Sequence, residues 1–84
     1  MYRVIKYGAK WCSQCRQQEK EFEKNPLNAA YHSIDVDDLS DKEIEDLKIK
    51  SIPVTIIWND DNGACQELKR WVGFVKSEEV NKWL

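Results

Sequence analysis

Apolar residues gather in four short stretches, and each stretch predicts a strand. Residues 2–7 and 31–36 mix β-branched or aromatic side chains with alternating polar positions. Residues 54–58 are apolar on both faces, which is typical of a central strand covered by helices. Residues 64–72 alternate weakly after a turn signal at 59–63, so they are expected to form the antiparallel edge partner of a hairpin.

Three other segments carry helix signals. Residues 12–24 contain no glycine or proline and are rich in Gln, Glu, Lys and Arg, with the charged part from Gln17 onward expected to face solvent. A capping-box pattern at residues 40–43 predicts the start of a second helix, and Ser77 is expected to cap a third. The apolar positions expected on these helices are Cys12, Cys15 and Phe22, then Ile44 and Leu47, then Val80, Trp83 and Leu84.

The element order is therefore β-α-β-α-β-β-α, which predicts an α/β fold in one domain spanning residues 1–84. Right-handed crossovers are expected to make the first three strands parallel, with helices on both faces. The hairpin adds an antiparallel edge, giving a four-stranded mixed sheet flanked by three helices. Gly8 is expected to supply the exit turn of the first strand, and Trp58 to lie in the core.

Charge and composition exclude several classes of function. The 84 residues include 13 basic and 15 acidic side chains, scattered along the chain, with a formal net charge of -2. No cationic stripe is present, so nucleic acid is not expected as a partner. The chain has no apolar stretch long enough for a membrane span or a signal peptide. We expect a cytoplasmic monomer.

Two of the three cysteines form a C-x-x-C motif at a predicted strand-to-helix junction. There the unpaired N–H groups and the helix dipole would stabilise a Cys12 thiolate, and Cys15 lies one turn away, within bonding reach. Cys12 is thus the expected nucleophile and Cys15 the thiol that resolves the mixed disulfide. This exchange needs no cofactor beyond the redox-active disulfide.

A half zinc site is the competing interpretation of the motif. Tetrahedral zinc needs four ligands, and only His32 and Cys65 remain, without a second paired spacing. No metal is therefore expected. We interpret Cys65 as a structural thiol and His32 as a surface residue.

Several motifs resemble thioredoxin landmarks and occur in thioredoxin order. The resemblance covers nearly the whole chain and corresponds to the minimal core shared with glutaredoxins, without the family's additional N-terminal strand and helix. The matching segments are Lys10-Trp11-Cys12-Ser13-Gln14-Cys15, Asp35-Val36-Asp37, Ile49-Lys50-Ser51-Ile52-Pro53-Val54 and Trp71-Val72-Gly73.

The resemblance implies a substrate groove beside Cys12. It implies a cis Ile52-Pro53 bond, with the backbone around Ile52 pairing to an extended substrate segment. Trp11, Val72 and Gly73 would line the same groove. A trans proline that starts a strand and a glycine that ends one are the alternative interpretations of Pro53 and Gly73.

Three features depart from the family patterns. Lys6 stands where thioredoxins carry a buried aspartate thought to assist proton transfer at the resolving cysteine; an amine that reaches water is favoured over one beside the sulfurs. Ser13-Gln14 is neither the Gly-Pro of thioredoxins nor the Pro-Tyr of glutaredoxins. The Thr-Val-Pro and Gly-Gly-Asp elements of glutaredoxins are missing, which favours protein disulfides over glutathione as substrates.

The resemblance therefore implies a protein-disulfide reductase recycled by a thioredoxin-reductase-like electron donor. Two alternatives remain open. One is a glutaredoxin-like, glutathione-dependent oxidoreductase, and the other is a non-catalytic module that binds a partner or a metal.

Overall fold

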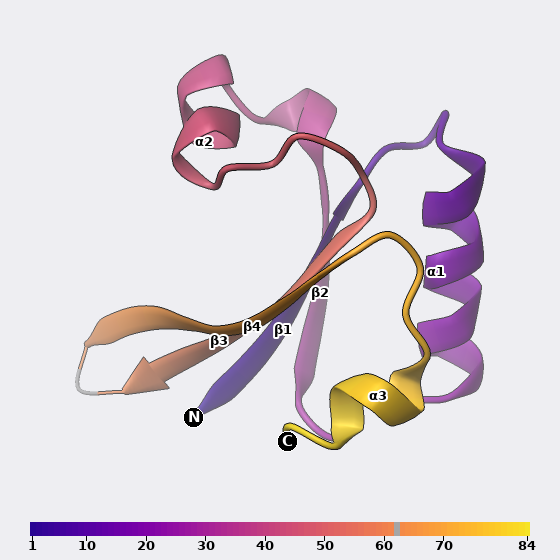
Figure 1. Cartoon of the computed structure of the whole chain (residues 1–84), viewed down its shortest axis with the longest axis vertical. Helices are drawn as coiled ribbons and strands as arrows, with labels where there is room; N and C mark the ends of the chain where they lie inside the picture. The colour runs from indigo at the N-terminus through magenta and orange to yellow at the C-terminus, as the bar shows by residue number, and fades with distance from the viewer. Residues whose placement is uncertain (62) are drawn as a thin grey trace.

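The chain folds into a four-stranded sheet with helices on both faces, as the computed structural model of residues 1–61 and 63–84 shows (Figure 1). The predicted order of strands and α-helices is confirmed, with one additional 3-10 turn, η1. No helix in this described part is long and apolar enough to cross a membrane. The elements are β1 (Tyr2–Gly8), α1 (Ser13–Lys24), β2 (Ala30–Asp35), η1 (Val36–Asp38), α2 (Asp41–Asp46), β3 (Val54–Asp61), β4 (Ala64–Val72) and α3 (Ser77–Asn81).

The strands lie in the order β2-β1-β3-β4, so β3 is central, as predicted. Strand β1 is parallel to β2, but β3 runs antiparallel to both β1 and β4. The expectation of three parallel strands is therefore wrong. Helix α2 has only 6 residues, about 9 Å, and cannot carry the chain back along a strand of about 20 Å. The chain instead re-enters the sheet at the end where β2 left it, with Val54 beside Tyr7.

Two apolar clusters fill the two sides of the sheet. Helices α1 and α3 cover one face and α2 lies over the other, which confirms helices on both sides (Figure 1). The cluster under α1 and α3 consists of Val4, Phe22, Ile57, Val75 and Val80. The cluster on the α2 side is built on Tyr7, Val54 and Ile56.

The two shorter helices begin differently from one another. Helix α2 has both hydrogen bonds of the predicted capping box, between Ser40 and Glu43, while Ile44 and Leu47 are half-buried. The prediction that Ser77 caps α3 is wrong, because the cap is Lys76, which makes no side-chain bond. Ser77 is the first helical residue and is buried against α1, where its N–H donates to a carboxylate oxygen of Glu21 at 2.9 Å.

The two tryptophans assigned to the core have different environments. Trp58 is half-buried and packs against the α2-side cluster. Trp83 is 46% exposed, so its assignment to the core is wrong. Helix α3 ends at Asn81, and Trp83 lies beyond it with the Lys69 ammonium 5.2 Å from its ring centroid.

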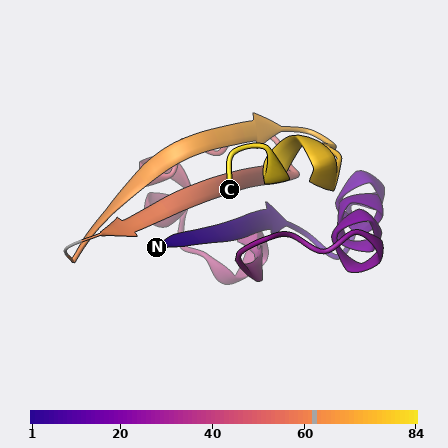
Figure 2. The ribbon, with the colours of Figure 1, turned by 90° about the horizontal axis from the view of Figure 1, so that it is seen from below.

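The β3–β4 hairpin projects beyond the helices (Figure 2). Strand β3 continues to Asp61, so Asn59 to Asp61 belong to a strand and their assignment to a turn is wrong. Asn62, which was also assigned to this turn, lies outside the described residues.

Candidate redox site

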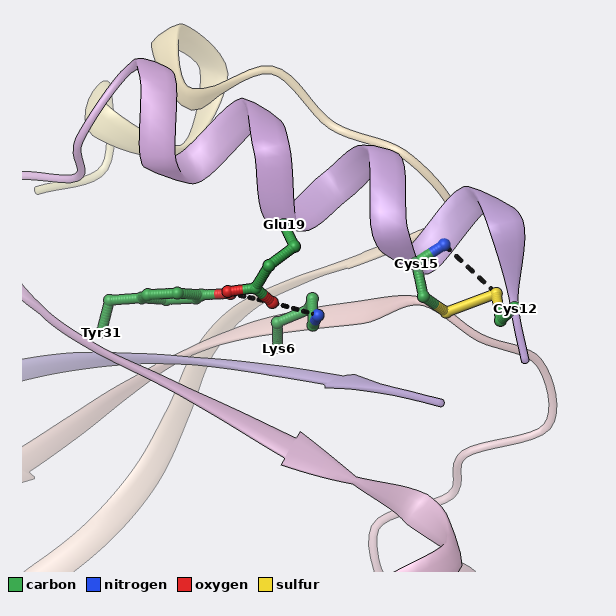
Figure 3. Close-up of polar contacts among 5 residues, drawn as sticks. All are labelled: Lys6, Cys12, Cys15, Glu19 and Tyr31. Atoms are coloured by element: carbon green, nitrogen blue, oxygen red, sulfur yellow. Dashed lines mark hydrogen bonds and ion pairs between the residues drawn. A yellow bond between two sulfur atoms is a disulfide. The ribbon is translucent and has the colours of Figure 1, made fainter. Parts of the chain in front are cut away.

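Cys12 and Cys15 form a disulfide at the start of α1 (Figure 3). Cys12 is the N-cap of the helix, with an extended backbone, and the Cα atoms of the two cysteines are 5.2 Å apart. Cys12 is half-buried, whereas Cys15 is 1% exposed. Of the two sulfur-bearing residues, only Cys12 is accessible from outside.

The N-terminus of α1 supplies a hydrogen bond to the Cys12 sulfur. The backbone N–H of Cys15 donates to Sγ of Cys12 at 3.2 Å. A thiolate at Cys12 would accept the same bond and would lie at the positive end of the helix dipole, and both effects favour the ionised form. The geometry thus provides the environment that the strand-to-helix position of the motif predicts.

Gly8 makes room for the buried cysteine. A Cβ at this position would lie 3.1 Å from both Cβ and Sγ of Cys15, and 3.4 Å from Cε of Lys6. Its backbone does not lie in the left-handed region, where only Gly63 and Gly73 are found among the described glycines. The space that Gly8 leaves free therefore explains the glycine better than the backbone freedom expected for an exit turn.

The amine of Lys6 is buried behind the disulfide. Lys6 is 6% exposed, and its ammonium forms an ion pair with the Glu19 carboxylate on α1 (Figure 3). The expectation of a lysine with its amine in water is wrong. The pleat of β1 places Lys6 on the same face as Val4, beneath α1, where Glu19 provides a partner.

The Glu19 carboxylate is held in its charged form. Burial opposes ionisation and is the largest single effect, but the hydrogen bond and charge of Lys6 and the hydrogen bond from Tyr31 outweigh it and lower the pKa of Glu19. The Tyr31 hydroxyl lies 3.1 Å from Oε2 of Glu19. Burial, followed by the charge of Glu19, raises the pKa of Tyr31 well above its ordinary value.

Trp11 lies at the surface next to the disulfide and is held in place by η1. It is 68% exposed, and its indole Nε1 donates to Oδ2 of Asp37 at 3.0 Å. Trp11 and Ile52 line the same hollow of about 380 Å³, together with apolar residues that include Ile44 and Ile49. Two of the residues assigned to the groove by resemblance are thus brought together.

Pro53, Val72 and Gly73 meet at the open end of the β3–β4 hairpin, where β3 begins and β4 ends. The Ile52-Pro53 bond is cis, and the N–H of Gly73 donates to the Pro53 carbonyl at 2.8 Å. Val72 is 64% exposed. Gly73 has φ +88, and Oε1 of Gln14 lies 4.0 Å from the place of its missing Cβ. This left-handed backbone explains why a glycine stands here.

The sequence interpretation missed several residues that support the site. Gln18 belongs to the stretch expected to face solvent, yet it is 0% exposed and bonds both backbone groups of Val75. Its position three residues after Cys15 and four before Phe22 puts it on their face, a signal that its polar side chain obscured. Glu19 and Asp37 were also missed as partners of Lys6 and Trp11.

Cys65 is a free, exposed cysteine on the projecting hairpin. The interpretation of Cys65 as a structural thiol does not fit this exposed position. His32 is exposed on β2, as predicted. Within residues 1–61 and 63–84, no group of three or more His, Cys, Asp and Glu side chains is arranged to hold a metal ion.

Comparison with solved structures finds thioredoxins. A Trichomonas vaginalis thioredoxin superposes with a TM-score of 0.79 at 19% identity, over 99% of this chain and 79% of that one. A Plasmodium falciparum thioredoxin has a TM-score of 0.74 at 25% identity, over 96% and 66%. A mutant thioredoxin from Halobacterium salinarum has a TM-score of 0.79 at 20% identity, over 98% and 70%. This chain thus spans only part of each of these proteins.

No family model and no curated protein matches the chain. The superposition nevertheless covers nearly all of it, and the Cys12-Cys15 pair lies at disulfide distance. The superposition shows the fold, and the Cys12-Cys15 disulfide makes these two residues the candidate redox pair. The chain has the thioredoxin fold.

Proposed function

We propose that this protein reduces disulfides in other proteins by dithiol-disulfide exchange through Cys12 and Cys15. The observation that carries the proposal is the asymmetry of the pair: Cys12 is partly accessible at the helix N-terminus, and Cys15 is buried behind it at bonding distance. A substrate can reach the first sulfur and is excluded from the second.

In the proposed reaction, the Cys12 thiolate attacks one sulfur of the substrate disulfide. A bond forms between Cys12 and that sulfur, the substrate S–S bond breaks, and the other substrate sulfur leaves with the electron pair and takes up a proton. Cys15 then loses its proton and attacks Sγ of Cys12. The second substrate thiol is released, and the protein is left oxidised, with the substrate reduced by two electrons.

The surface around Cys12 suits an extended polypeptide. Trp11 and Val72 offer exposed apolar area, while Gly73 leaves room for a backbone to approach. Ile52 lines the hollow that Trp11 shares, and the Pro53 carbonyl accepts the N–H of Gly73. In this proposal these five residues bind the substrate, and the backbone at Ile52 pairs with it.

The cycle closes only when an external dithiol donor reduces the Cys12-Cys15 disulfide. We assign this step to a thioredoxin-reductase-like protein in the cytoplasm, with the chain acting as a monomer and without a bound cofactor. Such a donor would use the same accessible sulfur, because Cys15 is buried.

Insulin reduction with dithiothreitol as the electron source tests the function. Wild type should accelerate precipitation of the insulin chains, while Cys12→Ser and Cys15→Ser should not, and Cys65→Ser should behave as wild type. No acceleration by wild type would overturn the proposal. A parallel assay on a glutathionylated peptide distinguishes a glutathione-dependent enzyme, and partner binding without turnover would indicate a non-catalytic module.

A further inference from the structure

A buried cation lies next to the buried sulfur of the redox pair. Lys6 and Cys15 line one hollow of about 340 Å³ beneath the start of α1, and Glu19 lines it as well. Cε of Lys6 and Sγ of Cys15 both lie within 3.4 Å of a single point, the place of the missing Cβ of Gly8. Figure 3 shows the Lys6 ammonium between Glu19 and the disulfide.

This ion pair differs from the other pairs in the described part of the chain. The Lys6 side chain is 7% exposed, whereas the cations of the other pairs are between 23% and 82% exposed. A buried ion pair is weak evidence for a contribution to stability, since an apolar pair of similar volume often serves as well. The position of this pair next to Cys15 provides another reason for its charge.

We propose that Lys6 is a positioning residue that stabilises the thiolate of Cys15 during release of the substrate, and that Glu19 limits this effect by partly neutralising the ammonium. The inference rests on the proposed dithiol exchange and names the residues that regulate its second half. The sequence resemblance implies an acidic residue at the position of Lys6. In this chain the charge of that side chain is positive instead of negative, so its effect on the Cys15 thiol has the opposite sign.

In the step concerned, Cys15 gives its proton to solvent at the mouth of the hollow, and the remaining thiolate is stabilised by the Lys6 ammonium. The thiolate attacks Sγ of Cys12, the Cys12-Cys15 bond forms, and the bond between Cys12 and the substrate breaks. The electron pair leaves with the substrate sulfur, which takes a proton from solvent.

Other charged groups line the same hollow but are less buried than Lys6. They come from the loop before α1, from α1, from β2 and from η1, and each is more exposed than Lys6, so solvent screens it more strongly. These groups are Lys10, Arg16, Glu19, Asp35 and Asp38.

The test is an NMR titration of the Cys15 Cβ resonance in the fully reduced protein, which measures ionisation even though the thiol is buried. Lys6→Met should lower the thiolate fraction of Cys15 at neutral pH roughly tenfold, as expected for loss of one nearby opposite charge. Glu19→Gln should raise that fraction. Lys20→Met is the matched control, because it removes an exposed lysine from α1, the helix that carries Glu19. It should leave the thiolate fraction of Cys15 unchanged.

Opposite changes of the Cys15 thiolate fraction in Lys6→Met and Glu19→Gln support the inference. Loss of packing alone would not change the thiolate fraction in opposite directions in the two variants. Unchanged titration, or a shift in the same direction in both variants, overturns the inference. If Lys6→Met fails to fold, the direction measured for Glu19→Gln decides. The titration does not depend on turnover. Failure of insulin reduction by wild type would therefore overturn the proposed function, while the Cys15 titration would still decide whether Lys6 and Glu19 set the ionisation of Cys15.

Discussion

The side-chain amide of Gln18 bonds both backbone groups of Val75. Nε2 of Gln18 donates to the Val75 carbonyl at 2.8 Å, and the Val75 N–H donates to Oε1 of Gln18 at 2.7 Å. Both residues are buried. This pair of bonds holds the segment after β4, which carries Gly73, against the helix that carries the redox cysteines.

Gln18→Leu should destabilise the protein by about 2–4 kcal/mol, because it leaves two buried backbone groups of Val75 without partners. Urea unfolding measures the change. Gln17→Leu provides the control, since Gln17 is exposed on the same helix. Equal stability of the two variants would contradict the structural role given to Gln18.

Gly8→Ala should destabilise the protein by about 1–3 kcal/mol, because the new methyl group would contact the Cys15 side chain too closely. The loss should be smaller in a Cys15→Ala background, where one of the close atoms has been removed. A double-mutant cycle of unfolding free energies measures this coupling. Simple additivity would show that Gly8 is needed for another reason.

Acid should weaken the protein partly through Glu19. Its pKa is lowered in the folded state, so as pH falls below about 4.5 the unfolded chain binds more protons than the folded one, and stability decreases until the folded pKa is passed. Glu19→Gln should therefore lose less stability between neutral and acidic pH than wild type. Glu23→Gln, at an exposed position on α1, is the control. Identical acid dependence in wild type and Glu19→Gln would count against a charged Glu19.

Asp37→Ala should free the Trp11 indole and weaken substrate binding. The exposed Trp11-Asp37 bond is worth about 0.5–1.5 kcal/mol, so the KM for insulin should rise a few-fold with little change in kcat. Asp46→Ala, which removes an exposed carboxylate from α2, is the comparison. A fall in kcat without a change in KM would mean that Trp11 does not act in binding.

Local signals were sufficient to predict the order of the elements. The capping box at Ser40, the absence of helix breakers from α1 and the two-sided apolar run of β3 each depend on neighbouring residues only. The redox pair followed from the C-x-x-C spacing, because one helical turn brings the two sulfurs together.

Features that depend on tertiary contacts were not predicted. The antiparallel direction of β3 follows from how little of the sheet α2 spans, and Trp83 lies outside the core because α3 ends before it. The burial of Gln18 and Lys6 depends on partners 57 and 13 residues away in the sequence. The spacing of Gln18 from Cys15 and Phe22 places it on their face of α1, but the partner that a buried Gln18 or Lys6 finds is not indicated by neighbouring residues.

The most direct test of the central claim is to trap the substrate on the protein. Cys15→Ser should stop the reaction after its first half, so incubation with oxidised insulin should yield a mixed disulfide, and peptide mass spectrometry should locate it at Cys12. The same incubation with Cys12→Ser/Cys65→Ser should yield no adduct, because Cys15 is buried. The absence of an adduct at Cys12 of Cys15→Ser would contradict dithiol exchange through this pair.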